Sequence, residues 1–591
     1  MMKPARLLTV LAASATLSVG SLSAAAQEKV AHLPIRTDGP KVLDPVQGST
    51  TYDNMACVQV YETLLENKYT DPMQIQPLLL AEMPVTEDGG KTWSFKLKEG
   101  VLFHDDECFP GGKGRAVVSD DVFYSLKRHA DPEHEYENWW LLENTIMGFD
   151  DYKNNASESG EIDYDEDISG FRKISDTEFE IELVEPVYRF LYILSMFQTA
   201  IVPREAVEYY GQDFSFNPVG TGPFVLEDFV PKKHLYFVKN PNYHEVFYPE
   251  ASEWSSEDRR NRMHRAGGKQ VPFLDRLEMT MYVQDNPMWL RFKEGDLGYT
   301  QVPAESFEEA FDSRTKQLKP DWRRDGYRSH TNALLDFIFR GFNMEDDLVG
   351  GYSEDKKALR QAINLAMNLD EFSDTFYEGN TVQYDGPIPP GLDGHPEGGR
   401  APVSYRGPNR EKARQKLVEA GYPDGEGLPV IKFYTSNGAN NAEQVELMKR
   451  QLAEVGIVID PVLVDFSTLI EFINTKKAAF FGFAWSSDYP DAENNLALFY
   501  GPNEAPGSNH YNYKNAEYDA LYEQIRTMGP SEERTEIYTR MRDMLIEDAP
   551  FVGSMARQRY YLINPWLLNC KPSERYYSWY KFLDVDNSKK N

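Results

Sequence analysis

One short segment of the chain brings together residue types that suit the binding of a small, positively charged group. Residues 485–491 read Trp-Ser-Ser-Asp-Tyr-Pro-Asp and follow an apolar run, 478–484, that is typical of a buried strand. Asp488 therefore falls just past the carboxyl end of the predicted strand, at the edge of an α/β sheet where small ligands bind. A carboxylate there can accept a hydrogen bond from an ammonium group, and the indole of Trp485 can cover apolar or cationic parts of a ligand.

The same segment is also compatible with a simple turn. Asp, Tyr and Pro are common turn residues, and an aspartate in a turn can bond to its own backbone. Taken alone, residues 485–491 favour neither interpretation, so the surrounding elements decide between them.

The elements that position this segment alternate between strand and helix. Apolar periodicity predicts strands at 430–434, 457–464 and 478–484, with helices at 442–455 and 466–475 between them. This order predicts parallel strands joined by right-handed crossovers. The third strand would then deliver Asp488 to the edge of the sheet.

Elsewhere the pattern predicts further strands and helices. Alternating apolar residues predict strands at 92–97, 101–103, 177–183, 235–238, 277–283 and 337–342. One helix is expected to begin at an N-capping Ser119, and another is expected at 356–369. The acidic stretch 150–167 predicts a solvated surface insertion.

The N-terminus has the order of features of a secretory signal peptide. Lys3 and Arg6 precede an apolar run, 7–19, and small residues lead to a predicted cut after Ala26. The run is too short for a membrane-spanning helix. The first cysteine is Cys57, so none lies near the cut to carry a lipid. We therefore expect an exported, soluble, periplasmic protein that is not inserted in a membrane.

Composition argues against several classes of protein. The formal net charge of the 591 residues is −32 at pH 7, which repels nucleic acid and anionic lipid and favours solubility. Nucleic acid is therefore not expected as a partner. Only Cys57, Cys108 and Cys570 are available, so at most one disulfide can form, and the sequence does not choose the pair.

Motifs for catalysis or cofactor binding are not evident. Residues 104–108 (His-Asp-Asp-Glu-Cys) are capable of binding metal but are adjacent in sequence, which favours a polar turn. The glycines of 111–114 lack the spacing of a phosphate-binding loop. Nucleophile-elbow, zinc-protease and dinucleotide fingerprints do not occur. We expect no catalytic residue, metal or cofactor, although a scattered Ser/His/Asp triad stays open.

Several segments, in order, resemble the extracellular solute-binding proteins of family 5, the periplasmic components of peptide-type ABC importers. Each segment is weak alone, but their order is specific. They are Thr-Thr-Tyr-Asp at 50–53 with Val-Tyr-Glu-Thr-Leu at 60–64, the strand–turn segment 95–105, the segment 120–128, the glycine turn 218–224 and the helix segment 359–364.

The resemblance implies an α/β, two-lobe periplasmic-binding-protein fold of type II, in its large cluster, with an extra subdomain in lobe one. Such a fold encloses its ligand by hinge closure. The expected divisions are a signal peptide at 1–26, lobe one at 27–65, 216–330 and 554–591, the extra subdomain at 66–215, and lobe two at 331–553.

The resemblance also implies the site and its partners. In the family, the aspartate of the tryptophan motif receives the α-ammonium group of a peptide, a role that falls here to Asp488, with Trp485, Ser487 and Tyr489 beside it. Thr51 and Tyr52 would approach from the other lobe. A monomer that delivers its solute to ABC permease subunits is expected. An exported hydrolase and a ligand-sensing partner of a membrane receptor remain the alternatives.

One departure bears on the solute. Dipeptide-binding members hold the ligand carboxylate with an arginine in the loop after the strand that matches 430–434. Residues 435–444 contain neither arginine nor lysine. An oligopeptide held through its backbone, or another amine-bearing solute, is therefore expected rather than a dipeptide.

Overall fold

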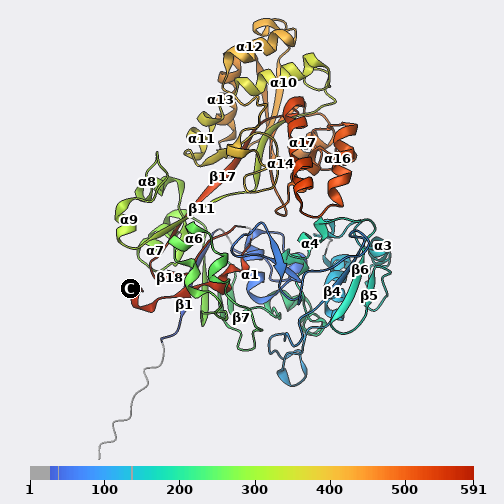
Figure 1. The fold of residues 1–591 in the computed structure, drawn as a ribbon, viewed down its shortest axis with the longest axis vertical. Helices are drawn as coiled ribbons and strands as arrows, with labels where there is room; N and C mark the ends of the chain where they lie inside the picture. Colours follow the sequence, from blue (N-terminus) through green and yellow to red (C-terminus); the bar gives the residue numbers. More distant parts are fainter. Residues whose placement is uncertain (1–26, 37–38, 135–137, 439, 575, 591) are drawn as a thin grey trace, which may run out of the picture.

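The chain folds into two lobes, each with its own hydrophobic core (Figure 1). The computed structural model describes residues 27–36, 39–134, 138–438, 440–574 and 576–590, so the predicted signal peptide lies outside the described residues. The end of the chain returns to lobe one, where Lys590 Nζ donates to the Val30 carbonyl at 2.9 Å.

Lobe one is built on a four-stranded sheet in the order β1-β9-β8-β7. Strand β1 pairs in parallel with β9, and the other pairs are antiparallel. The alternation in β9 buries Leu277, Met279 and Met281 on one face, as period-2 patterning requires. The elements of this part are β1 (Val30–Arg36), α1 (Thr51–Val60), β2 (Leu65–Asn67), β3 (Ile75–Pro77), β7 (Phe224–Val230), β8 (His234–Lys239), α6 (Ser256–Arg260), β9 (Arg276–Tyr282), α7 (Asp285–Lys293), β10 (Tyr299–Gln301), α8 (Phe307–Ala310), α9 (Pro320–Arg324), β18 (Leu567–Leu568) and β19 (Asp584–Val585).

A smaller sheet, β4-β6-β5, carries the segment between β3 and β7. Phe95 of β4 stacks on Phe179 of β6, with ring centroids 4.9 Å apart, inside a core that continues into the lobe-one sheet. The elements are β4 (Thr92–Lys96), α2 (Ser119–Lys127), α3 (Phe149–Ser159), β5 (Phe171–Lys173), β6 (Glu178–Glu182), α4 (Arg189–Ile193) and α5 (Arg204–Tyr210).

Lobe two contains the strand–helix alternation that the sequence predicts. Strand β14 pairs in parallel with both β15 and β16, so the expected parallel pairing is confirmed. Phe480 of β16 belongs to one core cluster and Phe481 to another, because the strand is buried on both faces. The elements are β12 (Asp336–Phe342), α10 (Glu354–Ala366), α11 (Leu369–Tyr377), β13 (Thr381–Gln383), α12 (Arg410–Glu419), β14 (Ile431–Ser436), α13 (Asn441–Ala453), β15 (Ile459–Val464), α14 (Phe466–Asn474), β16 (Phe480–Ser486), α15 (Ala492–Leu496), α16 (Ala516–Arg526) and α17 (Glu532–Asp548).

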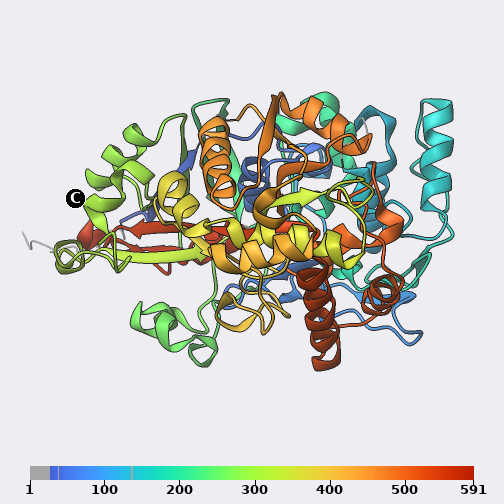
Figure 2. The ribbon, with the colours of Figure 1, turned by 90° about the horizontal axis from the view of Figure 1, so that it is seen from above.

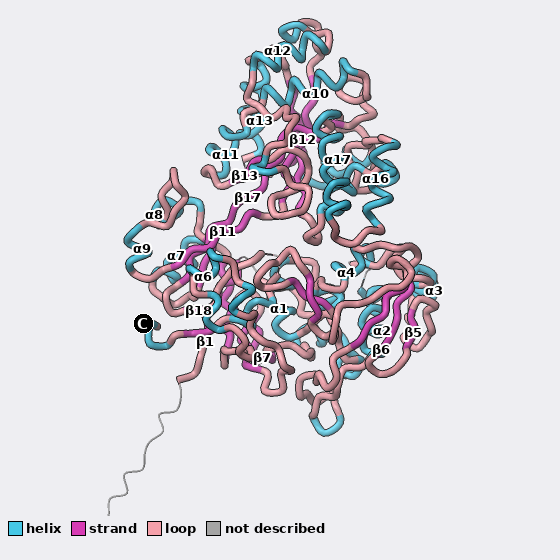
Figure 3. Tube along the Cα trace, viewed as in Figure 1, coloured by secondary structure: helices cyan, strands magenta, loops and turns pink. Residues whose placement is uncertain are grey.

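Two strands cross between the lobes. Strand β17 (Phe551–Ile563) pairs with β12 and β13 of lobe two through its first half, and with β11 (Arg328–Ala333) and β10 through its second half. Figures 1 and 3 show β17 running on from one lobe into the other with β11 beside it, and Figure 2 shows the same arrangement from above. The β11–β17 pair is antiparallel. The domain divisions expected from the sequence stay a prediction.

Two local predictions need correction. Residues 101–103 form no strand, and only Leu102 makes an isolated bridge, to Ala116. The helix expected at 356–369 is α10, but it ends at Ala366, and the Asn368 side chain, which accepts from the Glu371 N–H at 3.2 Å, starts the next helix, α11. The acidic stretch 150–167 is mostly exposed, as expected, and its first part lies in helix α3.

The N-cap position at α2 also differs from the prediction by one residue. The cap of α2 is Val118, and Ser119 is the first helical residue. Ser119 Oγ does not cap the helix but donates to the Ser175 carbonyl at 2.9 Å. Its hydroxyl therefore links α2 to the turn before β6.

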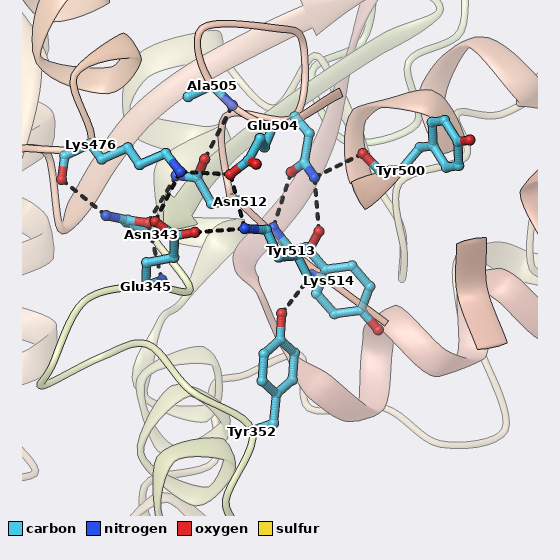
Figure 4. Close-up of polar contacts among 11 residues, drawn as sticks. Asn343, Glu345, Tyr352, Lys476, Tyr500, Glu504, Ala505, Asn512, Tyr513 and Lys514 are labelled. Atoms are coloured by element: carbon cyan, nitrogen blue, oxygen red, sulfur yellow. Dashed lines mark hydrogen bonds and ion pairs between the residues drawn. The ribbon is translucent and has the colours of Figure 1, made fainter. Parts of the chain in front are cut away.

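A charged network fixes the loops at one side of lobe two (Figure 4). Lys476 and Lys514 each lie within 3.0 Å of both Glu345 and Glu504. These side chains are partly exposed, so the network orders the loops more than it stabilises the fold. Beneath it, buried Asn512 donates to Asn343 Oδ1 at 2.9 Å.

Gly553 interrupts β17 in the part of the strand that pairs with lobe two. Between the β12 positions Ile338 and Arg340 the register shifts, and β17 contributes one extra residue, with Gly553 in the left-handed region at φ +72°. A Cβ at this position would meet Leu369 Cδ2 at 3.1 Å. The bulge therefore requires glycine for its conformation and for its space.

Replacing Gly553 by alanine should lower the free energy of unfolding by at least about 1–2 kcal/mol, because an L-residue is disfavoured in the left-handed region. Urea denaturation followed by circular dichroism measures the loss. Gly398→Ala is the control, since Gly398 has φ +61° and open space around its Cα. A loss at Gly553 no larger than at Gly398 would contradict the role given to Leu369.

Candidate functional site

A cavity of about 410 Å³ separates the two lobes beside the tryptophan motif. Lobe two contributes the turn 486–490 that follows β16, and lobe one contributes residues of α1 and the C-terminal residues Glu574, Tyr576, Tyr577, Ser578 and Lys581. Helix α4 of the small-sheet region adds Tyr192. We call this space the first cavity; Asp488, Ser487, Tyr489 and Thr51 all line it.

Asp488 stands just past the end of β16, as the sequence predicts. Its Oδ2 accepts from Asn494 Nδ2 at 3.0 Å, and its backbone N–H donates to Asn494 Oδ1 at 3.2 Å. Asn494 lies in the short helix α15, so this helix orients the carboxylate at the cavity wall. The Asp488 side chain is partly exposed, which leaves it accessible to a ligand.

Trp485 and Ser487 hold the motif in place through hydrogen bonds of their side chains. Trp485 lies inside β16, packs against the lobe-two core and donates from Nε1 to Asn494 Oδ1 at 2.8 Å. It lines neither the first cavity nor the cavity that adjoins it beside Tyr52. Ser487 is buried, and its Oγ bonds to the Leu335 carbonyl at 3.1 Å. That bond ties the motif to the chain that has just crossed from lobe one.

Tyr489 links lobe two to the small-sheet region. Its ring stacks on that of Tyr192, with centroids 5.6 Å apart and planes 11° from parallel. Its hydroxyl donates to Glu493, and burial raises the pKa of Tyr489 well above its usual range. The Tyr489–Tyr192 pair therefore forms an aromatic side of the first cavity.

Asp491 has a structural role that the sequence does not reveal. Its Oδ2 lies 2.6 Å from Arg534 Nη1, and both side chains are about 5% exposed. Its Oδ1 accepts from the Tyr538 hydroxyl at 2.5 Å and from the Glu493 N–H at 2.9 Å. Asp491 thus caps α15 and anchors the motif to α17.

Lobe one supplies acidic residues to the first cavity that sequence reasoning missed. Glu66 Oε2 lies 2.7 Å from Lys581 Nζ, and Glu62 Oε2 lies 2.8 Å from His244 Nε2. Glu62 also accepts from the Tyr243 hydroxyl at 2.7 Å. The only sequence signal for Glu62 was its place within the segment 60–64.

The Glu62 carboxyl keeps its charge although it is buried. Burial by itself raises its pKa, but the neighbouring His244 and the hydrogen bonds from His244 and Tyr243 lower the pKa to about 2. Glu62 is therefore ionised at every pH at which the protein is expected to work.

A second cavity, of about 530 Å³, adjoins the first and holds Tyr52. Both cavities are lined by Thr51, Ser486, Glu574 and Tyr577, so they meet at these residues. The structure therefore brings Thr51 to Asp488 but places Tyr52 on the far side of Thr51. Burial raises the pKa of the Tyr52 hydroxyl, which stays protonated.

The described residues include no group of three or more His, Cys, Asp and Glu side chains arranged to hold a metal ion. Within 104–108, Asp105 pairs with Lys113 at 2.7 Å and His104 Nε2 lies 3.0 Å from the Gly222 carbonyl, as in a polar turn. Cys57, Cys108 and Cys570 are all unpaired. In the part of the chain that the structure describes, no helix is long and apolar enough to span a membrane.

Comparisons with known proteins define the family. The model of the bacterial extracellular solute-binding proteins, family 5 (middle part), matches residues 74–507, and the chain belongs to this family. The chain is 24% identical over 515 residues to heme-binding protein A of Haemophilus influenzae, covering 85% of this chain and 82% of the relative. It is 23% identical over 581 residues to the oligopeptide-binding protein AppA of Bacillus subtilis, covering 92% and 91%.

Structural comparison agrees. HbpA2 from Haemophilus parasuis superimposes with a TM-score of 0.75 at 18% identity, over 94% of this chain and 100% of that chain. The two-lobe α/β fold predicted from the sequence is confirmed. The roles of the six predicted site residues stay predictions, although four of them line the first cavity and Tyr52 the second.

Replacing Asp491 by asparagine should lower the free energy of unfolding by about 3–5 kcal/mol, because it leaves Arg534 charged, buried and without its carboxylate. Denaturant titration measures the loss. Asp488→Asn is the matched control and should cost less than about 1 kcal/mol, since asparagine still offers Asn494 an acceptor at a partly exposed position. Equal losses would contradict this division of roles.

Acid should unfold the wild type more steeply than Glu62→Gln. A carboxyl whose pKa is lower in the folded state stabilises the fold above pH ~4.5 and loses that contribution as the pH falls towards about 2. The contribution is about 3 kcal/mol for a shift of this size. Unfolding free energies measured from pH 6 to pH 2.5 should therefore converge for the two proteins, and a constant difference across the range would oppose this account.

Proposed function

We propose that the chain is the periplasmic solute-binding component of an ABC importer, which captures an amine-bearing peptide by hinge closure and delivers it to a membrane permease. Membership of family 5 supports solute binding, and the position of Asp488 at the interlobe cavity supports the amine. The importer, the permease contact and the periplasmic location belong to the proposal.

The excess of carboxylates in the first cavity is the observation that supports this proposal most directly. Its described lining includes four carboxylates, from Glu62, Glu66, Asp488 and Glu574, against the single ammonium group of Lys581. Glu62 and Glu66 are committed to buried partners within lobe one, whereas Asp488 is partly exposed. An ammonium group entering between the lobes therefore meets a negative potential and a carboxylate within reach. The volume lies in the range of small-molecule sites.

A peptide longer than a dipeptide suits the lining better than a dipeptide does. The described residues of 435–444, where dipeptide-binding members of the family hold the ligand carboxylate, line neither cavity and include no cation. One relative, AppA, is named for oligopeptide binding. The second cavity offers space beyond the first in which a longer chain can lie.

Heme is the second candidate, because another relative is named a heme-binding protein. Titration with hemin, followed by its Soret absorbance, tests this candidate directly. Hemin binding that peptides do not displace would favour heme over a peptide.

Asp488→Asn should weaken binding of a peptide with a free N-terminus by about 10-fold or more, since charge-assisted hydrogen bonds contribute about 1.5–3 kcal/mol. Native mass spectrometry of the purified protein with peptide libraries finds a ligand, and calorimetry then measures its affinity for the wild type and the variant. The same peptide with an acetylated N-terminus should bind both proteins weakly and equally.

Asp321→Asn is the control for net charge, because Asp321 lies in the exposed helix α9 and pairs only with nearby Arg324. It should leave the affinity unchanged. Unchanged affinity in Asp488→Asn would remove Asp488 from the ammonium role. Cleavage of the bound peptide by the pure protein would favour the alternative of an exported hydrolase.

A further inference from the structure

The second cavity is lined by more cations than carboxylates, which is the reverse of the first. Its described lining includes the cations Arg36, Arg557, Arg559 and Lys571, against the carboxylates Asp336 and Glu574. This local excess of cations occurs in a chain whose net charge is −32. Arg557 and Arg559 come from β17, and Lys571 from the C-terminal return to lobe one.

Three of these cations are committed to partners of the fold. Arg557 forms two hydrogen bonds with Asp336, at 2.6 and 3.1 Å. Arg36 likewise contacts both oxygens of Asp285, at 2.8 and 3.0 Å. Lys571 Nζ lies 3.1 Å from Asp258 Oδ2. Such pairs neutralise one another and leave little attraction for a ligand.

Arg559 differs from the other three. Its nearest carboxylate is Glu574, with Nε and Oε1 3.5 Å apart, a distance at which they attract but form no hydrogen bond. Arg559 Nε is buried without a hydrogen-bond partner among the described residues. Glu574 Oε1 already accepts from the Tyr561 hydroxyl. The buried Nε–H is costly while it has no acceptor. The Arg559 side chain as a whole is 26% exposed, so an acceptor on a ligand can reach it.

The two cavities together distinguish the ends of a solute. They meet at Thr51, Ser486, Glu574 and Tyr577, so one ligand can reach Asp488 and Arg559 at the same time. The planar fork of an arginine matches a carboxylate, with two parallel N–H···O bonds. His330, which also lines the second cavity, has its pKa lowered to about 4 by burial and is neutral at pH 7.

We propose that the second cavity binds a carboxylate of the same solute whose ammonium group lies at Asp488, with Arg559 as its principal partner. The proposal rests on the function proposed above and narrows it to a zwitterionic solute bound in one orientation. Strand β17 of the hinge then supplies the cation that the loop 435–444 lacks. The carboxylate can come from the C-terminus of a peptide or from a propionate of a tetrapyrrole.

The test compares peptide libraries of two to six residues, each prepared as the free acid and as the C-terminal amide, with the full mature chain. Native mass spectrometry identifies the bound peptides, and calorimetry gives the ratio of acid to amide affinity. The wild type should prefer the acid by about 10-fold or more. Arg559→Gln should remove this preference and change the affinity for the amide by less than about three-fold.

Arg324→Gln is the control. It removes the same charge as Arg559→Gln, but from an exposed position on α9. It should keep the preference for the acid. If Arg559→Gln does not fold, the ratio of acid to amide affinity measured with the wild type decides the inference by itself. Equal wild-type affinities for acid and amide would overturn it while leaving peptide capture at Asp488 intact.

A comparison of hemin with its dimethyl ester tests whether the bound carboxylate belongs to a tetrapyrrole rather than to a peptide. Binding of hemin but not of the ester, lost in Arg559→Gln, would support the carboxylate site with a tetrapyrrole as the solute and would overturn peptide capture. If neither the peptides nor hemin bind, both the proposed function and this inference fail.

Discussion

The arrangement of the two lobes depends on one strand, β17, which pairs with strands of both lobes. The thirteen residues of β17 satisfy their backbone hydrogen bonds with β12 and β13 at one end and with β11 and β10 at the other. The lobes therefore cannot separate without breaking a ladder, and relative motion has to be taken up by bending or twisting of the β11–β17 pair. The bulge at Gly553 relaxes the register on the lobe-two side, where one residue has no direct opposite. The connection between the lobes is thus part of a sheet rather than a loose linker.

The tryptophan motif shows how few of the residues in a binding segment face a ligand. The side chains of Trp485, Ser487 and Asp491 form hydrogen bonds with Asn494, Leu335 and Arg534, respectively. Asp488 alone among the polar residues of the motif combines partial exposure with a place on the cavity wall and an orienting partner in α15. The buried neighbours fix the backbone so that this carboxylate has a defined direction. A mutation in any of them is expected to act through stability, which is why binding data need a stability measurement beside them.

The sequence correctly predicted the structural features that are determined by residues close together in the chain. The strands of lobe two follow from apolar runs, and the place of Asp488 follows from the end of β16, because both are local properties. The helix predicted to reach residue 369 ends at Ala366, because the Asn368 cap, a side-chain bond, starts a new helix there. The family resemblance grouped both Thr51 and Tyr52 with Asp488, yet successive residues at a helix start point in different directions. Glu62, Glu66 and Arg559 were out of reach, since their charged partners His244, Lys581 and Glu574 lie 182, 515 and 15 positions away in sequence.

The opposite charges of Asp488 and Arg559 have a consequence for how a solute arrives. A zwitterion in front of a pair of fixed charges of opposite sign experiences a torque before it makes any contact. At physiological ionic strength this field decays over about 8 Å, so it acts only inside the space between the lobes. Under the proposed assignment the solute is turned head to tail as it enters, and the search over wrong orientations is shortened. The gain then appears in the rate of association and fades as salt is added, while the hydrogen bonds that hold the bound solute are screened much less.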